Sequence, residues 1–195
     1  MKRLWWGFKV GFRVRKHDCA TAAAPLAAAF GGRFGLPFAI PAPGPASLVK
    51  IISFNANGLR SAASKGFFDW LPGQHADIVC IQETKAQEHQ LRVEALLPTG
   101  YTAYFRDATT KKGYSGVGIY TRREPDEVRT ALGWESFDEE GRYIEARYGN
   151  LSVVSLYFPS GSSGDERQQF KFRCMEWFTP ILDQWLASGR DYVIC

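Results

Sequence analysis

The chain has 195 residues, of which 45% are hydrophobic and 14% aromatic, which suffices for one domain with a hydrophobic core and excludes a wholly disordered protein. The net charge of +4 comes from residues 1–49, which hold 7 Lys/Arg against 1 acid, whereas residues 50–195 hold 17 against 19. Net charge therefore gives no support for nucleic-acid binding by the globular part, which would need a local basic patch.

The first 48 residues differ in composition from the rest. Residues 1–49 contain 10 Ala, 6 Gly and 5 Pro without a helical or strand period, so we expect a low-complexity basic leader and no packed domain. The basic start suggests a signal or transit peptide, but Trp5, Trp6 and Phe8 interrupt it. A membrane span is disfavoured because no 18-residue window is free of Pro, Gly clusters or charge. We favour the interpretation that residues 1–48 are translated leader sequence, which follows a start codon assigned too far upstream. The domain then spans residues 49–195.

Strand patterning begins at Val49 and recurs along the chain. Runs of β-branched and aromatic residues bounded by Gly, Pro or Asn predict the strands. The dipeptide Gly149-Asn150 lies between two such runs and predicts a short turn that pairs them as a hairpin. The predicted strands are 49–54, 77–81, 101–106, 116–121, 143–148, 151–158 and 191–195.

Three helices are expected between these strands. Early strands alternate with helices and later strands pair as hairpins, which favours mixed sheets covered by helices, an α/β fold. The last helix carries one apolar stripe that we assign to core packing, and we expect Pro180 to kink it. The predicted helices are 64–71, 86–97 and 165–187, and the stripe consists of Phe170, Cys174, Trp177, Phe178, Ile181 and Trp185.

The four cysteines, Cys19, Cys80, Cys174 and Cys195, show no C-x-x-C spacing. Cys80 and Cys195 lie in apolar, strand-like runs, where a reduced and buried thiol is the ordinary interpretation. The cysteine pattern therefore favours a cytoplasmic protein.

Two of the predicted strands end in polar residues. The run from Ile51 to Phe54 leads into Asn55 and Asn57, and the run from Ile78 to Ile81 leads into Gln82 and Glu83. A carboxylate delivered from one strand end, beside amide side chains from another, suits a hard cation such as Mg²⁺ that prefers oxygen ligands. The pattern indicates metal-assisted phosphate chemistry.

Five short motifs in a fixed order carry a family resemblance. Residues 49–195 resemble the N-terminal part of exonuclease III and the related apurinic/apyrimidinic endonucleases, within the endonuclease/exonuclease/phosphatase superfamily. The resemblance implies a four-layer α/β sandwich, here truncated at the C-terminus, and it covers none of residues 1–48. The motifs are Ser53 to Arg60 (SFNANGLR), Ile81 to Lys85 (IQETK), Gly113 to Gly118 (GYSGVG), Glu140 to Arg142 (EGR) and Tyr157 to Gly161 (YFPSG).

The resemblance implies roles for the residues at the strand ends. Glu83 matches the glutamate that binds Mg²⁺ or Mn²⁺, where the cation polarises a phosphoryl oxygen. Asn55 matches a catalytic residue that helps to place the metal or the nucleophile, and Asn57 stands in a supporting position. Tyr157 matches the active-site tyrosine that interacts with the scissile phosphate, while Ser160 stands where several relatives carry Asn or Gln.

The same resemblance places DNA contacts on neighbouring loops. Arg60 and Lys65 match positions that touch DNA phosphates, and Tyr114 and Ser115 lie in a glycine-rich loop that can approach the duplex closely. Lys111 and Lys112 precede this loop and add a local positive patch. Two further residues have supporting roles, Lys85 close to phosphate and Arg142 in a structural position.

The function implied is that of a DNA-repair nuclease. Such an enzyme removes nucleotides from 3′ ends of double-stranded DNA and incises abasic sites with Mg²⁺ or Mn²⁺; we expect it to act as a monomer without a membrane partner. The chain holds no G-D-x-N motif and no late Asp-His pair, although residues 190–195 look like the strand before G-D-x-N. His17, His75 and His89 lie in no such context, so no general base is assigned. We expect the chain as written to be an inactive fragment, its truncation an artefact of sequencing or gene assignment.

Two other classes of function remain open from the sequence. A different phosphoesterase of the same superfamily, acting on lipid headgroups, inositol phosphates or RNA, would share the chemistry of Asn55 and Glu83. A non-catalytic DNA-binding remnant would bind duplex DNA in a salt-sensitive way that does not depend on Glu83.

Overall fold

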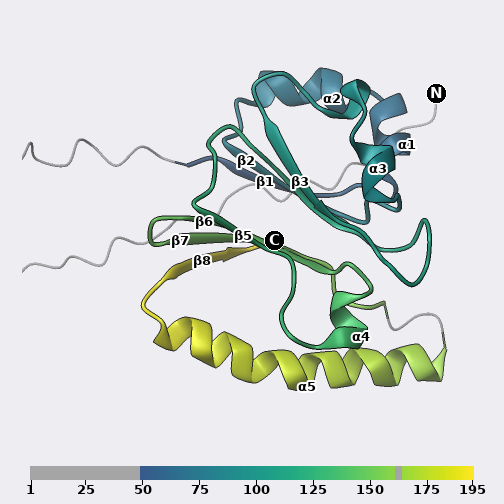
Figure 1. The fold of residues 1–195 in the computed structure, drawn as a ribbon, viewed down its shortest axis with the longest axis vertical. Helices are drawn as coiled ribbons and strands as arrows, with labels where there is room; N and C mark the ends of the chain where they lie inside the picture. Colours follow the sequence, from purple (N-terminus) through teal and green to yellow (C-terminus); the bar gives the residue numbers. More distant parts are fainter. Residues whose placement is uncertain (1–48, 161–163) are drawn as a thin grey trace, which may run out of the picture. The chain divides into compact units, whose positions relative to one another are not determined.

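The computed structural model describes residues 49–160 and 164–195, so the predicted leader at 1–48 lies outside the described residues. The described part contains two four-stranded β-sheets that lie between two layers of helices (Figure 1). This arrangement confirms the α/β class and the layered sandwich that the sequence predicts.

The first sheet has the strand order β1-β2-β4-β3. Strands β1 (Ile51–Asn55) and β2 (Ile78–Gln82) are parallel, and β4 (Val117–Thr121) runs antiparallel to β2 and to β3 (Thr102–Arg106). Because β1 and β2 are parallel and Asn55 pairs with Gln82, the polar residues that follow both strands emerge at the same edge of the sheet.

The second sheet has the order β5-β6-β7-β8. Strands β6 (Tyr143–Tyr148) and β7 (Leu151–Leu156) form the predicted hairpin, since they pair antiparallel across the two-residue turn of Gly149 and Asn150. β5 (Glu127–Arg129) flanks β6, and β8 (Asp191–Ile194) pairs parallel with β7. The return from β7 to β8 is made by the long helix α5 (Asp165–Ala187).

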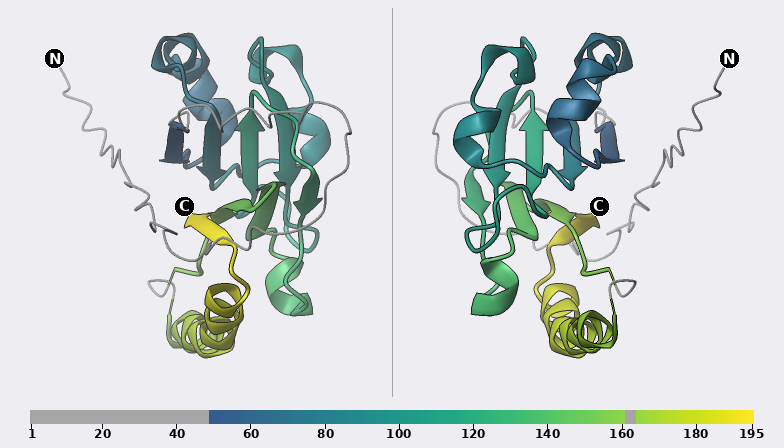
Figure 2. Two further views of the ribbon diagram at one scale, coloured as in Figure 1. Left: turned by 90° about the vertical axis from the view of Figure 1, so that its left-hand side faces the viewer. Right: turned by 90° about the vertical axis from the view of Figure 1, so that its right-hand side faces the viewer.

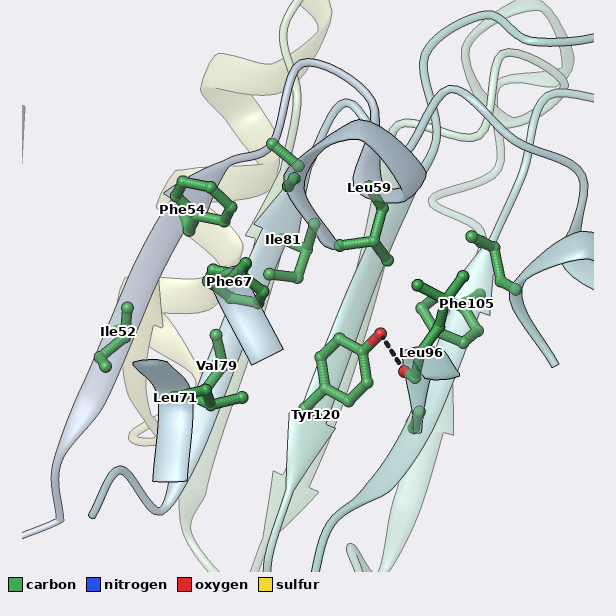
Figure 3. Packing of buried hydrophobic residues seen from close by; sticks show 14 of the residues in the cluster. Ile52, Phe54, Leu59, Phe67, Leu71, Val79, Ile81, Leu96, Phe105 and Tyr120 are labelled. Atoms are coloured by element: carbon green, nitrogen blue, oxygen red, sulfur yellow. Dashed lines mark hydrogen bonds between the residues drawn. The ribbon is translucent and has the colours of Figure 1, made fainter. Parts of the chain in front are cut away.

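Short helices cover the outer face of the first sheet (Figure 2). They enclose an apolar core in which the Tyr120 hydroxyl donates to the Leu96 carbonyl at 2.8 Å (Figure 3). Phe54 and Phe67 stack in this core with ring centroids 4.5 Å apart. The covering elements are α1 (Leu59–Ser64), α2 (Phe67–Trp70), η1 (Leu71–Gln74), α3 (Glu88–Leu91) and η2 (Glu94–Leu96).

The inner faces of the two sheets share a second core, and the outer face of the second sheet carries a third. Between the sheets pack Ile78, Cys80, Val117, Ile119, Ile144, Ala146, Tyr148 and Val153. The third core lies under α4 (Glu135–Asp138) and α5 and is rich in aromatic residues. Four residues of the predicted apolar stripe of α5 pack in this third core, namely Phe170, Cys174, Trp177 and Trp185.

The predicted strands and the helix at 165–187 are confirmed, while the shorter elements differ. The region predicted as one helix at 64–71 holds α1, which begins at Leu59, and then α2; the region 86–97 holds α3 and η2. Strand β5 and helix α4, of three and four residues, were not predicted. Elements this short bury too few side chains to show a period in the sequence.

The cysteines of the described part are reduced, as expected. Cys80 and Cys174 are buried and Cys195 is half-buried, all three as free thiols, while Cys19 lies outside the described residues. A hydrogen bond from Cys195 together with burial raises the pKa of the Cys80 thiol well above its ordinary value. Within 49–160 and 164–195, no helix has the length and hydropathy to cross a bilayer.

Candidate active site

Backbone hydrogen bonds join the loops that follow β1 and β2. The amides of Ala56, Gly58 and Leu59 donate to the carbonyls of Gln82, Glu83 and Thr84, at 2.8, 2.8 and 2.9 Å. These bonds continue the parallel pairing of β1 and β2 beyond the ends of the strands. The side chains on the two loops are therefore held in register with each other.

Four residues around these loops have a left-handed backbone although none is glycine. The φ angles are 45° at Asn57, 56° at Glu83, 49° at Lys85 and 50° at Ser115. Such residues are uncommon, and they persist where the surroundings determine the backbone, frequently at functional sites. Here the amide of Lys85 donates to the Ser115 carbonyl at 2.9 Å, which ties the glycine-rich loop to the loop after β2.

The carboxylate of Glu83 is the centre of the polar cluster. One carboxylate oxygen accepts a hydrogen bond from the side-chain amide nitrogen of Asn55 at 2.6 Å, and the other forms an ion pair with the Lys85 ammonium at 2.9 Å. Burial raises the pKa of Glu83, but hydrogen bonds from Asn55, Lys85 and Tyr157 outweigh it and hold the pKa below its ordinary value. Glu83 is therefore ionised at neutral pH.

The two asparagines complete this cluster. The Asn55 side-chain oxygen accepts a hydrogen bond from the main-chain amide of Asn57 at 3.0 Å. The Asn57 side-chain oxygen accepts a hydrogen bond from the Lys85 ammonium. The structure thus brings together Asn55, Asn57, Glu83 and Lys85, which the sequence assigned to one site.

Tyr157 reaches this cluster from the second sheet. It follows β7, and burial together with the negative charge of Glu83 raises the pKa of its phenol. Tyr157 is therefore a neutral hydrogen-bond donor at neutral pH. Its backbone is held by Arg142: the Tyr157 amide donates to the Arg142 carbonyl at 2.9 Å, and the Arg142 guanidinium donates to the Tyr157 carbonyl at 2.8 Å.

Arg142 is more central than its supporting assignment suggested. Its side chain is 1% exposed, and its charge is paired with Glu140 at 2.6 Å. It lies 4.8 Å from the ring of Tyr157 and donates to the hydroxyl of Tyr114 at 2.8 Å. Arg167 of α5 donates to the same hydroxyl at 2.6 Å, a contact that sequence reasoning missed.

The other predicted DNA contacts each have their own surroundings. Arg60 is exposed and lines a cavity of about 330 Å³ together with Gln87, His89, Gln90, Lys112 and Gly113. Lys65 is exposed at the C-terminal end of α1. Ser115 is buried, and its hydroxyl has no hydrogen-bond partner in the described part of the chain, so it acts here through its backbone. These assignments stay predictions.

The donor set at the strand ends fits a hard divalent cation. Glu83 supplies an ionised carboxylate, whose oxygens face the Asn55 amide nitrogen and the Lys85 ammonium, and Asn55 supplies an amide oxygen that accepts a hydrogen bond from the Asn57 main chain. Mg²⁺ is commonly held by one or two carboxylates with its remaining positions filled by water and phosphate. No group of three or more His, Cys, Asp or Glu side chains that could hold a metal occurs in residues 49–160 and 164–195. A cation at this site would therefore rely largely on water or substrate oxygens.

Comparison with known proteins agrees with the geometry. The model of the endonuclease/exonuclease/phosphatase family matches residues 52–193. The chain belongs to this family. The recognition made from the five motifs is thereby confirmed.

Among curated proteins, the chain is 38% identical over 150 residues to an exodeoxyribonuclease of Bacillus subtilis, covering 75% of this chain and 57% of that protein. It is 34% identical to a DNA-(apurinic or apyrimidinic site) endonuclease of Dictyostelium discoideum, covering 66% of this chain and 35% of that protein. Among solved structures, an AP endonuclease from Archaeoglobus fulgidus is similar with a TM-score of 0.58 and 32% identity, covering 66% of this chain and 49% of that one. The chain thus spans about half the length of such relatives, or less.

Proposed function

We propose that the protein containing these residues hydrolyses phosphodiester bonds in double-stranded DNA, removing nucleotides from 3′ ends and incising abasic sites. The observation that carries the proposal is the convergence of Glu83, Asn55 and Tyr157 at one end of the two sheets. The likeness to an exodeoxyribonuclease and to abasic-site endonucleases supports DNA as the substrate. The free thiols of the described part support a cytoplasmic enzyme, and we propose that it acts as a monomer.

The roles follow from the chemistry of the side chains. Glu83 and Asn55 would hold Mg²⁺ or Mn²⁺, which polarises the phosphoryl oxygen and stabilises charge on the leaving oxygen when bound. Lys85 and Tyr157 present an ammonium and a phenol to the same place, and both groups donate hydrogen bonds to anions. Arg60 lies in α1 and Lys65 at the end of that helix, while Tyr114 and Ser115 lie in the glycine-rich loop; all four would position the duplex.

The test is a binding and cleavage assay on the 195-residue chain. A duplex with a tetrahydrofuran abasic-site analogue is titrated with the protein in Mg²⁺ and in EDTA. We expect salt-sensitive binding that Mg²⁺ strengthens, and we expect Glu83→Gln to remove the Mg²⁺ effect. The matched control is Glu88→Gln, because Glu88 pairs with Arg92 on α3 and has no contact with Glu83.

The same samples separate the other candidate functions. Duplex binding that is equal in Mg²⁺ and EDTA and unaffected by Glu83→Gln would identify a DNA-binding remnant. Displacement of the duplex by micromolar inositol phosphate or by single-stranded RNA would favour another phosphoesterase. Incision of the abasic duplex that requires both Mg²⁺ and Glu83 would establish the nuclease directly.

A further inference from the structure

We propose that Arg167, together with Arg142 and Glu140, is a positioning residue that holds the hydroxyl of Tyr114 as a hydrogen-bond donor for a DNA phosphate. This inference rests on the proposed function and adds to it a residue of α5 that no family motif contains. It also gives Tyr114 a defined chemical role, which the resemblance alone did not supply.

The hydrogen bonds at the Tyr114 oxygen fix the direction of its proton. The oxygen accepts one bond from Arg142 at 2.8 Å and one from Arg167 at 2.6 Å. A guanidinium can only donate, and a phenol oxygen offers two lone pairs. Both lone pairs are therefore occupied, and the O–H group has to donate elsewhere. Among the described residues the Tyr114 proton has no acceptor, and its side chain is partly exposed, so the proton is available to a ligand.

The charges around Tyr114 favour an anionic acceptor. In the described part of the chain, Glu140 is the acid that pairs with both guanidinium groups: its oxygens lie 2.6 Å from Arg142 and 2.9 Å from Arg167. These three groups carry a net charge of +1, and the Lys111 ammonium lies 5.0 Å from the centre of the Tyr114 ring. A phosphate oxygen is an anionic acceptor of the kind that such a donor recognises.

The geometry of Arg167 marks it as a residue that acts through Tyr114. Its side chain is 27% exposed, and its guanidinium lies 4.8 Å from the ring of Phe170, one turn further along α5. Phe170 is itself buried in the core under α5. The core thus orients Arg167, Glu140 neutralises it, and Arg167 in turn holds the Tyr114 hydroxyl.

Arg142 joins this arrangement to the cluster around Glu83. The same guanidinium that donates to the Tyr114 hydroxyl also donates to the backbone carbonyl of Tyr157. One buried side chain therefore ties the Tyr114 hydroxyl to the main chain at Tyr157, whose own phenol donates to Glu83. The Tyr114 donor is thus linked to the cluster around Glu83 through Arg142 and Tyr157.

The test is a double-mutant cycle on the full chain. Binding of the abasic-analogue duplex in Mg²⁺ is measured by fluorescence anisotropy for wild type, Tyr114→Phe, Arg167→Ala and the double variant. We expect each single variant to weaken binding about 5- to 10-fold, which lies within the range for the net loss of one hydrogen bond. The double variant is expected to bind no more weakly than Tyr114→Phe, since Arg167 acts only through the hydroxyl that this change already removes.

Three further measurements keep the outcome specific. Arg173→Ala is the matched control, because Arg173 also lies beside the Phe170 ring, at 5.8 Å, and has no hydrogen bond to Tyr114; it should bind as wild type. Arg167→Lys, which keeps the charge but loses the guanidinium fork, should behave as Arg167→Ala. The slope of log K against log salt should be the same in Arg167→Ala as in wild type. Thermal melts confirm that each variant is folded.

The inference is overturned if the Tyr114 and Arg167 substitutions weaken binding independently of each other, or if Arg167 contacts the DNA phosphate directly. A double variant 25- to 100-fold weaker than wild type would show that Arg167 acts without Tyr114. A salt slope reduced by about 1 in Arg167→Ala would show that Arg167 touches phosphate itself. Wild-type binding by Arg167→Lys would show that charge alone matters. If the wild-type chain shows no Mg²⁺-strengthened duplex binding, the proposed function fails first and this inference fails with it.

Discussion

The two sheets contribute to the candidate site in different ways. In the first sheet, Asn55 and Glu83 stand on loops held by backbone hydrogen bonds, and its buried polar side chains, such as Gln82 and Thr84, are uncharged. The second sheet and its flanks bury charged side chains, namely Asp138, Arg142 and Glu145. The difference indicates that the loops carrying Asn55 and Glu83 are positioned by main-chain hydrogen bonds, and the residues around Tyr114 and Tyr157 largely by ion pairs.

The cores of the two sheets differ as well. Over the first sheet, short helices enclose a core in which most side chains are almost completely buried, with Phe68, Trp70 and Tyr101 partly buried at its margin. Over the second, α5 contributes large aromatic residues, several of them only partly buried. We therefore expect the first core to contribute more to stability for each side chain of comparable size, and four predictions test or refine the contrast.

The largest effect should come from truncating an aromatic residue in the first core. Phe67 is 6% exposed and stacks on Phe54, so Phe67→Ala should lower the free energy of unfolding by about 4 kcal/mol. Trp185 stacks on Tyr192 with centroids 4.6 Å apart but is only half-buried, so Trp185→Ala should cost about 2 kcal/mol. Urea unfolding measures both, and equal losses would contradict the contrast between the cores.

The next effect concerns the glycine that precedes Arg142. Gly141 has a φ of 61°, and a Cβ there would lie 2.4 Å from the backbone carbonyl of Asp107, at the end of the first sheet. Because main-chain atoms cannot turn aside, Gly141→Ala should destabilise the fold by about 3 kcal/mol.

Gly149→Ala is the matched control for this change. Gly149 has a φ of 54°, and a Cβ there would meet nothing within 4 Å. Its cost should be the left-handed backbone alone, about 1 kcal/mol. If both alanine variants lose the same stability in urea unfolding, close packing between the sheets is not what requires glycine at 141.

The third prediction concerns the ion pairs of the second sheet. Burial raises the pKa of Glu140, but hydrogen bonds and charge from Arg167 and Arg142 outweigh it and hold the pKa below its ordinary value. Glu140→Gln should therefore cost about 2 kcal/mol at pH 7, since the buried guanidinium of Arg142 loses its counter-charge.

The sign of the pH dependence follows from the lowered pKa. The contribution of Glu140 to the free energy of unfolding is fully present above the ordinary carboxyl pKa of about 4.3. It is lost as the pH falls through the lower pKa that Glu140 has in the folded protein. The gap in unfolding free energy between wild type and Glu140→Gln should thus be constant from about pH 5 to 7 and should narrow steadily as the pH falls below about 4.3. A gap that does not narrow at all between about pH 5 and pH 3 would argue against the ion pair, and Glu135→Gln, at an exposed position of α4, is the control.

These contrasts also explain what the sequence could predict. Asn55, Asn57, Glu83 and Lys85 were assigned from sequence because they follow two predicted strands and match short family motifs. The parallel pairing of β1 and β2, which brings them to one sheet edge, is seen only in the structure. Arg167 gave no such signal, since it lies in the first turn of an amphipathic helix, where charged side chains usually face solvent. Its contact with Tyr114 spans 53 positions and depends on how α5 packs against the second sheet.

The burial of Arg142 could not be predicted from the sequence either. Charged residues are almost never fully buried unless they are paired, and neither composition nor period reveals the pairing. The Glu140-Gly141-Arg142 motif marked the position but not its geometry. Residues that the family motifs mark were therefore assigned to the site, whereas the contacts of Arg142 and Arg167 with Tyr114, which depend on packing between layers, were not predicted.

The smallest effect should appear at the ion pair of the first sheet. Lys85 pairs with Glu83 at 2.9 Å, but its side chain is 38% exposed, so water screens the interaction. Lys85→Gln should change the free energy of unfolding by less than about 1 kcal/mol, whereas the pairing partner lost in Glu140→Gln is worth about 2 kcal/mol. Urea unfolding at 0.05 M and 0.5 M NaCl measures the difference. A loss above 2 kcal/mol that persists in high salt would mean that side-chain charge, and not the hydrogen-bonded main chain, holds the loops after β1 and β2 together.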